Sequence, residues 1–288
     1  MSALTVEFAS SRYRFAGLNP EQDAVVRPRF QALLCRDDAS ADVHIDVHHD
    51  PNRGAFMRRP AGPSEYRIAV AHATDSIAVA GIGFTATIDR VPLRAQMQTC
   101  LSDDWFAGAF ENVFRVLACY RLFNQGALVM HSAAFTDGRR GFLFCGRSGA
   151  GKTTLCGLAQ ELELEILSDE LNAVAFHAGS SQLRALPFAG DFGGEPRPHP
   201  PYPLTGLLGL HQGLSPSVAD CSKAEAVSRI VASCPYLNAD PLLLDELTSR
   251  VEALLAQAPL RILSFAKNTK FWSVLNHEYP SCDAEVSP

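Results

Sequence analysis

Four short runs of the chain alternate apolar and polar positions. They cover residues 41–49, 64–73, 76–88 and 127–135, and such alternation is typical of half-buried β-strands. Residues 51–65 separate the first two runs and are rich in proline, glycine and charge, which indicates a loop. The pattern predicts an antiparallel sheet with long connections in the N-terminal part.

Residues 103–125 change to a helical period. Apolar side chains recur there three or four positions apart, at Trp105, Phe106, Phe110, Val113, Phe114, Leu117 and Tyr120. We interpret this stripe as core packing, and Gly126 as the residue that closes the helix.

The second half alternates strands and helices. A hairpin through residues 136–141 precedes a glycine-rich loop, a helix at 152–163 and an acid-interrupted strand at 164–176. Residues 178–203 have no regular period, and we expect a lid or substrate loop there. Further strands are expected at 203–210 and 260–265, with helices after Ser222, from an N-cap at Asp240 and Pro241, and at 269–277. The fold class is therefore α/β, with a β-rich α+β domain at 1–127, a larger domain with a mixed sheet flanked by helices at 128–278, and a loose tail at 279–288.

Composition narrows the function classes. Of the 288 residues 47% are apolar, and the net charge is −6, so the chain folds as a globular protein and no basic surplus indicates nucleic acid or acidic membrane as a partner. No signal peptide or membrane span is predicted, and the eight cysteines lack a CxxC pair. They are expected to be free thiols of a cytoplasmic protein.

Residues 146–153 match the pattern G-x-x-x-x-G-K-[ST]. An apolar strand precedes this segment and a helix follows it, as a P-loop requires. Glycines let main-chain N–H groups point at phosphate oxygens, and the following helix presents its positive end to them. Lys152 would contact the β- and γ-phosphates and Thr153 would offer a hydroxyl to Mg²⁺. The expected nucleotide-binding residues are Gly146, Arg147, Ser148, Gly149, Ala150, Gly151, Lys152, Thr153 and Thr154.

Asp169 and Glu170 end an apolar strand, 17 residues after Lys152 in the case of Asp169. A strand–loop–helix–strand unit places them on the neighbouring strand near the phosphates, where a carboxylate can hold Mg²⁺ or accept a proton. His131 lies on the strand before the P-loop strand. It could bind phosphate or orient an acid, and simple packing is an equal alternative.

Other polar groups carry weaker signals. His44, His48 and His49 resemble a metal cluster, but only His44 and His48 share a strand face, so we interpret them as structural or surface residues. In the expected lid, Asp191, Glu195 and Arg197 could bind metal or phosphate, with surface solvation as the alternative.

Residues 129–176 resemble the catalytic core of the HPr kinase/phosphorylase family, which is related to ATP-dependent phosphoenolpyruvate carboxykinase. His131 stands 15 residues before the first P-loop glycine, GRSGAGKTT matches the family's P-loop, and Ser168-Asp169-Glu170 falls where the family has an acidic pair. Segments between 201 and 275 resemble an HPr kinase-like branch found beside genes for modified peptides.

The resemblance implies roles for these residues. Lys152 would bind the transferring phosphate, Thr153, Asp169 and Glu170 would hold Mg²⁺, and Asp169 would act as the general base for a serine hydroxyl, with His131 as a further catalytic residue. Glu170 replaces the family's second aspartate. The EIRGLG element of bifunctional HPr kinases is absent, so HPr itself and phosphorolysis do not carry over. A homo-oligomer is implied, since HPr kinases are hexamers.

The sequence thus predicts a kinase that uses ATP and Mg²⁺ and phosphorylates a hydroxyl, with serine of a peptide or small protein expected. Two alternatives stay open. One is a small-molecule kinase, and the other is a nucleotide-binding regulatory or accessory protein without turnover.

Overall fold

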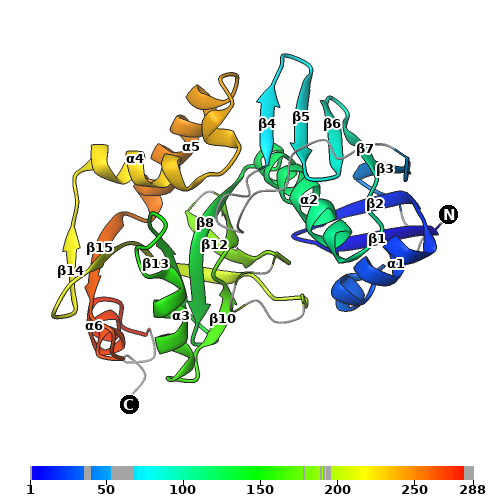
Figure 1. Cartoon of the computed structure of the whole chain (residues 1–288). Coiled ribbons are helices and arrows are strands. Elements are labelled where there is room, and N and C mark those ends of the chain that lie inside the picture. Colours follow the sequence, from blue (N-terminus) through cyan, green and yellow to red (C-terminus); the bar gives the residue numbers. More distant parts are fainter. Residues whose placement is uncertain are drawn as a thin grey trace. The chain divides into compact units, whose positions relative to one another are not determined.

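The computed structural model describes residues 2–35, 40–52, 68–177, 179–188, 190, 192 and 196–281. The chain divides into two compact units, each with its own sheet (Figure 1). Unit 1 comprises residues 1–124 with the short segments 195–198 and 240–242, and unit 2 comprises the remainder. Together they make a mixed α/β protein, and none of the helices in the described part of the chain is long and apolar enough to cross a membrane.

Unit 1 contains a mixed sheet in the order β1-β2-β3-β7-β6-β5-β4. Its strands are β1 (Ser2–Phe8), β2 (Ser11–Leu18), β3 (Val43–His49), β4 (Ala69–His72), β5 (Ser76–Gly81), β6 (Phe84–Arg90) and β7 (Leu93–Thr99). The expectation of a wholly antiparallel sheet is wrong, because β3 pairs in parallel with both β2 and β7. The link from β2 to β3 contains α1 (Pro20–Val26) and the 3₁₀ helix η1 (Pro28–Leu33), a crossover of the length that parallel strands need.

Helix α2 (Asp104–Asn124) supplies much of the core of unit 1. Phe110 and Phe114 are buried, and the Phe110 ring lies 4.1 Å from that of Phe15 on β2. The predicted helix and its apolar stripe are therefore confirmed, except at Trp105. That side chain is 49% exposed, because it sits in the first turn.

The sheet of unit 2 is also mixed. Its strands are β8 (Ala127–Thr136), β9 (Gly141–Cys145), β10 (Glu165–Ser168), β11 (Leu171–His177), β12 (Ser180–Ala185), β13 (Tyr202–Gln212), β14 (Ser217–Asp220) and β15 (Leu260–Phe265). The predicted β8–β9 hairpin is confirmed, and β9 pairs in parallel with β13 on its other side. Strand β12 lies inside the segment expected to be irregular, where it pairs with β11 and β13.

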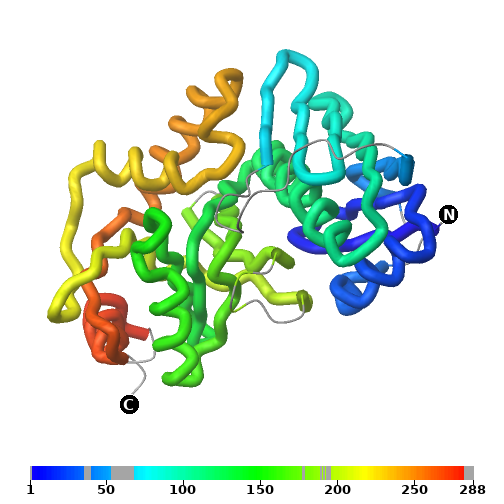
Figure 2. Tube along the Cα trace, viewed as in Figure 1, coloured from blue at the N-terminus to red at the C-terminus, as the bar shows by residue number. Residues whose placement is uncertain are grey.

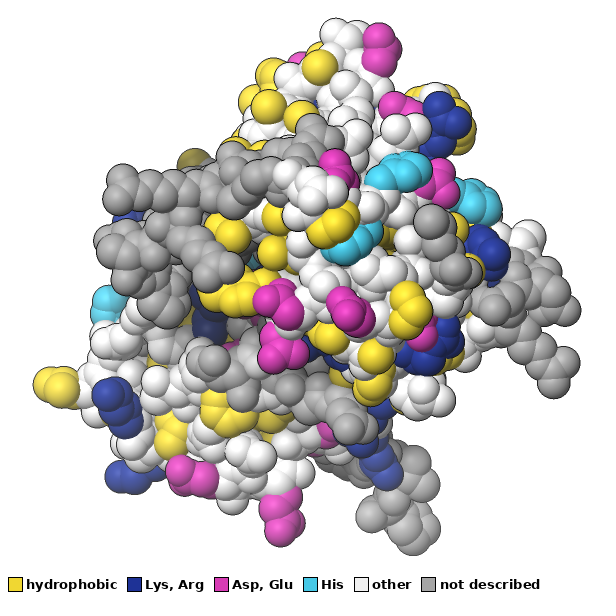
Figure 3. All heavy atoms as spheres, turned by 45° about the vertical axis from the view of Figure 1, so that its right-hand side comes forward, with side chains coloured by type: hydrophobic (Ala, Val, Ile, Leu, Met, Phe, Trp, Pro, Cys, Tyr) yellow, Lys and Arg dark blue, Asp and Glu magenta, His cyan; other side chains and the backbone are white. Residues whose placement is uncertain are grey.

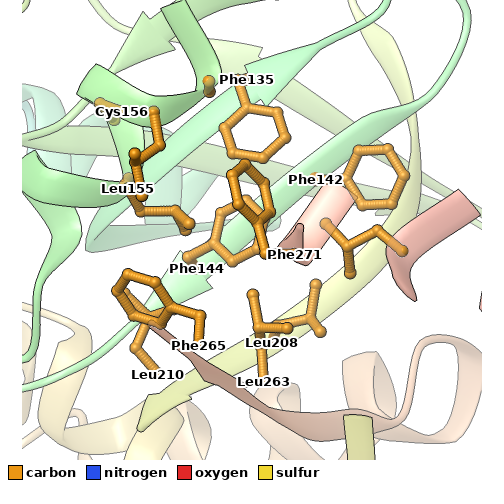
Figure 4. Packing of buried hydrophobic residues seen from close by; sticks show 14 residues of the cluster. Phe135, Phe142, Phe144, Leu155, Cys156, Leu208, Leu210, Leu263, Phe265 and Phe271 are labelled. Atoms are coloured by element: carbon orange, nitrogen blue, oxygen red, sulfur yellow. The ribbon is translucent and has the colours of Figure 1, made fainter. Parts of the chain in front are cut away.

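A cluster of buried apolar side chains joins this sheet to α3 (Lys152–Gln160) and α6 (Phe271–Glu278) (Figure 4). Leu155 and Cys156 of α3 are fully buried in it, as are Phe144 of β9 and Phe271 of α6. This packing fixes α3 directly after β9. The helix ends at Gln160, three residues before the predicted end, and Glu163 then takes a left-handed φ of 58°.

Helices α4 (Lys223–Ser233) and α5 (Leu244–Gln257) follow β14 and pack against each other (Figure 2). Helix α4 starts after Ser222 as predicted, and the Ser222 side chain caps it by accepting a hydrogen bond from the Glu225 N–H. The predicted N-cap at Asp240 is wrong, because α5 begins at Leu244. Within unit 1, the Asp240 carboxylate instead accepts a hydrogen bond from Tyr120 and pairs with Arg90.

Candidate functional site

The loop between β9 and α3 has the backbone that its glycines allow. Gly149 and Gly151 take φ values of 79° and 101°, in the left-handed region that side chains with a Cβ avoid. A Cβ on Gly151 would also lie 2.8 Å from the ring of Phe265. Any larger residue at position 151 would therefore disturb both the loop and the core beneath it.

The loop is braced from the sheet and from within. The Gln212 side chain at the end of β13 donates to the Gly149 carbonyl oxygen at 2.8 Å, and the Lys152 ammonium donates to that of Gly146 at 2.9 Å. Among the described residues no side chain caps the start of α3. The first N–H groups of the helix are consequently available to an anion.

Lys152 is the first residue of α3, and it is only 8% exposed. Burial lowers the pKa of its ammonium below the ordinary value, and the charges of Glu170, Cys145 and Asp169 partly offset that shift. A buried cation beside unpaired N–H groups is an arrangement that phosphate oxygens can satisfy.

The two acids lie between β10 and β11, and β8 separates them from the P-loop strand. Ser132 of β8 pairs with Cys145 at the end of β9, and its N–H donates to the Glu170 carbonyl oxygen at 3.1 Å on the other side. The acids are thus one strand further from β9 than predicted, because β8 lies between. Two strand spacings of about 4.8 Å still leave them within reach of a ligand on the loop.

Asp169 is the acid that faces the start of α3. It is 5% exposed, and the Thr153 hydroxyl donates to its Oδ2 at 3.3 Å. The N–H of Phe192 donates to Oδ1 at 3.3 Å, and a Cβ on Gly190 would lie 2.0 Å from the same oxygen. The carboxylate is therefore held between Thr153 at the helix start on one side and Gly190 and Phe192 on the other.

Glu170 lies close to His131. The Nε2 atom of His131 lies 3.8 Å from Oε2 of Glu170, and both side chains are partly exposed. The predicted site residues thus form one group around the P-loop, with Asp169 on the side of Thr153 and Glu170 on the side of His131.

The oxygen atoms at the site are of the type that Mg²⁺ takes as ligands. Mg²⁺ prefers hard oxygen ligands and keeps several of them from water and phosphate, and the Thr153 hydroxyl and the Asp169 carboxylate already meet at 3.3 Å. Among the described residues, no three side chains of His, Cys, Asp or Glu gather closely enough to hold a metal without such help. The pair fits a metal that arrives with a nucleotide.

A cavity of about 750 Å³ opens beside the loop. One side consists of strand and loop residues, and the other comes from α4. Its lining residues are His131, Cys145, Gly146, Arg147, Ser148, Ala150, Leu210, Glu225, Ser228, Arg229, Ala232 and Ser233. Sequence reasoning predicted the helix after Ser222 but missed its place at the site, because no local pattern links α4 to a loop about 75 residues earlier.

A buried polar network behind the acids was also missed. The Asn172 side chain donates to the carbonyl oxygen and hydroxyl of Ser132 at 2.9 and 3.1 Å, and to the Ser168 carbonyl oxygen at 3.3 Å. The Ser168 hydroxyl accepts from the N–H groups of Glu170 and Leu171. The one available signal was a polar residue inside the apolar run 171–176.

The weaker candidates lie elsewhere. His44 and His48 are exposed on β3 in unit 1, and Arg197 is exposed and grouped with unit 1. Asp191 and Glu195 lie outside the described residues.

On the face seen in Figure 3, acidic and basic side chains are interspersed rather than gathered by sign. The seven described cysteines are free thiols, and burial raises the pKa of Cys145 beside the loop to about 11.

Comparisons with known proteins do not identify a family for this chain. A scan of the sequence against protein-family models finds no match, and a comparison with curated proteins finds no significant match either. The features that bear on function are therefore the P-loop, the placement of Asp169 against Thr153, and the cavity beside the loop.

Proposed function

We propose that this chain is a kinase that uses ATP and Mg²⁺ and transfers the γ-phosphate to a hydroxyl group, with serine of a peptide or small protein as the expected acceptor. The observation that carries the proposal is the contact of Asp169 with Thr153 at the start of α3. It combines a buried carboxylate, a hydroxyl and a phosphate-binding loop in one place. The HPr kinase-like fold expected from the sequence belongs to the same proposal.

The chain's own groups have defined tasks in such a reaction. The N–H groups of the loop and of the start of α3 would bind the phosphates, and the Lys152 ammonium would neutralise charge on the transferring group. Bound Mg²⁺, held by Thr153 and Asp169 with the help of Glu170, would supply further charge neutralisation.

Asp169 would also orient the acceptor hydroxyl and take its proton as the hydroxyl oxygen bonds to the γ-phosphorus. The bond from that phosphorus to the bridging oxygen breaks in the same transfer, and ADP leaves. Its two oxygens already accept hydrogen bonds from Thr153 and from the Phe192 N–H, so the carboxylate is fixed before substrate arrives. Phosphoryl transfer depends mainly on such positioning and on electrostatics.

The decisive variant is Asp169→Asn, which keeps the size of the side chain but removes its charge and basicity. Transfer of label from γ-labelled ATP to serine peptides should fall by about 10²- to 10⁴-fold, the usual contribution of a general base. ATP binding, measured by calorimetry, should persist. Asp220→Asn is the control, since Asp220 is 87% exposed on β14 of the same unit.

The outcomes separate the alternatives. Unchanged transfer in Asp169→Asn would refute the assigned role of Asp169. Tight ATP binding without transfer to any peptide by the unmodified chain would favour the regulatory or accessory protein. ATP consumption with small hydroxyl metabolites, but not with peptides, would favour the small-molecule kinase.

A further inference from the structure

The α4 side of the cavity consists of residues outside the P-loop. The Lys152 ammonium, which reaches the β- and γ-phosphates in P-loops, donates to the carbonyl oxygen of Gly146. Gly146, Arg147 and Ser148 line the cavity, whereas Thr153 and Thr154 do not. The Lys152 ammonium thus lies 2.9 Å from an oxygen of a lining residue, so an acceptor in the cavity can approach the phosphate that Lys152 would bind.

Arg229 is the cation that α4 brings to this cavity. Its Cδ and one terminal nitrogen would lie 3.5 and 3.6 Å from a Cβ on Gly209, so the side chain lies over a strand position that carries no side chain. Its charge also lowers the pKa of buried Cys145 at the end of β9, against the larger opposite effect of burial. The guanidinium thus reaches from α4 toward the start of the P-loop.

Glu225 orients this guanidinium through its Nε–H group alone. The Nε–H of Arg229 donates to Oε1 of Glu225 at 2.8 Å. The structure gives the terminal nitrogens of Arg229 no hydrogen bond to another described residue. A guanidinium presents its N–H groups as a planar fork that matches the two oxygens of a carboxylate.

We propose that Arg229 binds a carboxylate of the phosphate acceptor, so that acceptors carry a negative charge near the hydroxyl that receives phosphate. This inference rests on the proposed kinase function and names the acceptor's chemistry. A carboxylate suits the cavity better than a phosphate, because Glu225 offsets part of the positive charge and would repel a dianion. The neutral hydroxyls of Ser228 and Ser148 on the cavity surface can accommodate the rest of a polar peptide.

The test uses the full chain with Mg²⁺ and a non-hydrolysable ATP analogue, and measures peptide binding by saturation-transfer NMR. Three serine pentapeptides with blocked N-termini serve as probes, and the first two are blocked at the C-terminus as well. One carries a glutamate beside the serine, the second carries glutamine instead, and the third carries glutamine and a free C-terminal carboxylate. The wild-type chain should bind a carboxylate-bearing peptide about tenfold to a hundredfold more tightly than the neutral one, the size expected for a charged hydrogen bond. The two carboxylate peptides distinguish a side chain from a chain end.

Arg229→Gln should abolish this discrimination, and Arg229→Lys should restore part of it. Arg250→Gln is the matched control, because Arg250 makes the same kind of i, i+4 ion pair, with Glu246, on α5. Equal binding of all three peptides by the wild type, or undiminished discrimination in Arg229→Gln, would overturn the inference. The proposed function is judged separately by transfer from ATP, so binding selectivity without transfer would support the Arg229 site and refute the kinase.

Discussion

The side-chain nitrogen of Asn172 lies 2.9 Å from the carbonyl oxygen of Ser132, to which it donates across two paired strands. Ser132 pairs with Cys145, the last residue before the P-loop, and Asn172 follows the two acids by two positions. Both side chains are fully buried. This contact therefore ties the strand beside the P-loop to the strand that carries Asp169 and Glu170.

The first prediction is that Asn172→Ala makes the positions of Asp169 and Glu170 less well fixed. Losing a buried donor leaves the oxygens of Ser132 and Ser168 without that partner, which costs about 1–3 kcal/mol. Transfer should fall by about tenfold, less than the roughly 10²-fold that a full ångström of misplacement costs, while ATP affinity stays near that of the wild type. Urea unfolding and labelled-ATP transfer check the two effects. Ser181→Ala is the control, because the hydrogen bond of Ser181 to Gln257 is exposed, and equal losses in both variants would contradict the prediction.

The sequence predicts what is local in this site and misses what is distant. The P-loop, its flanking strand and helix, and the acidic pair follow from patterns within the continuous segment 141–170. The Ser132–Asn172 contact joins positions 40 apart, and Asn172 by itself is only a polar residue in an apolar run. Arg229 is further still from the loop, and the i, i+4 pair with Glu225 looks like any solvated helix face.

The same reason explains the errors in the fold. Alternation of apolar and polar residues gives strands but not their partners, so the parallel pairing of β3 with β2 and β7 could not be foreseen. Asp240 followed by Pro241 has the local form of a helix start. Its carboxylate instead pairs with Arg90 and accepts a hydrogen bond from Tyr120, both more than a hundred positions away in the sequence.

The second prediction concerns Gly190. A glycine is needed there because the Asp169 carboxylate lies too close to leave room for a side chain, not because of the φ angle. An added Cβ would lie 2.0 Å from Oδ1 of Asp169, so Gly190→Ala should displace that carboxylate. Transfer is expected to fall by about 10²-fold, as for an ångström-scale misplacement, with ATP binding retained. Gly108→Ala is the control, since no atom lies within 4 Å of its added Cβ in α2. That variant should keep full transfer and gain up to about 1 kcal/mol of stability.

The third prediction is a pH dependence of nucleotide affinity. Burial lowers the pKa of Lys152 in the free protein below the ordinary 10.5. Phosphate favours the protonated ammonium, so affinity should be constant while Lys152 is charged. It should then decline by about tenfold per pH unit above that lowered pKa. Calorimetric titration of ATP between neutral pH and pH 10 checks this. Lys152→Ala should bind weakly and lose the slope, whereas Lys223→Ala, at a 74% exposed side chain, should keep it.

The fourth prediction concerns the buried ion pair between Asp240 and Arg90 in unit 1. Burial raises the pKa of Asp240, but hydrogen bonds from Tyr120 and Arg90 outweigh it, and the net pKa lies below 3.8. The charged form therefore stabilises the fold above pH 3.8, and that contribution vanishes as the pH falls through the lowered pKa. Asp240→Asn should cost about 3 kcal/mol at pH 7, because it leaves the Arg90 charge unpaired. Urea unfolding should show the difference shrinking below pH 3.8. A constant difference, or an equal loss in the exposed variant Asp75→Asn, would contradict this account.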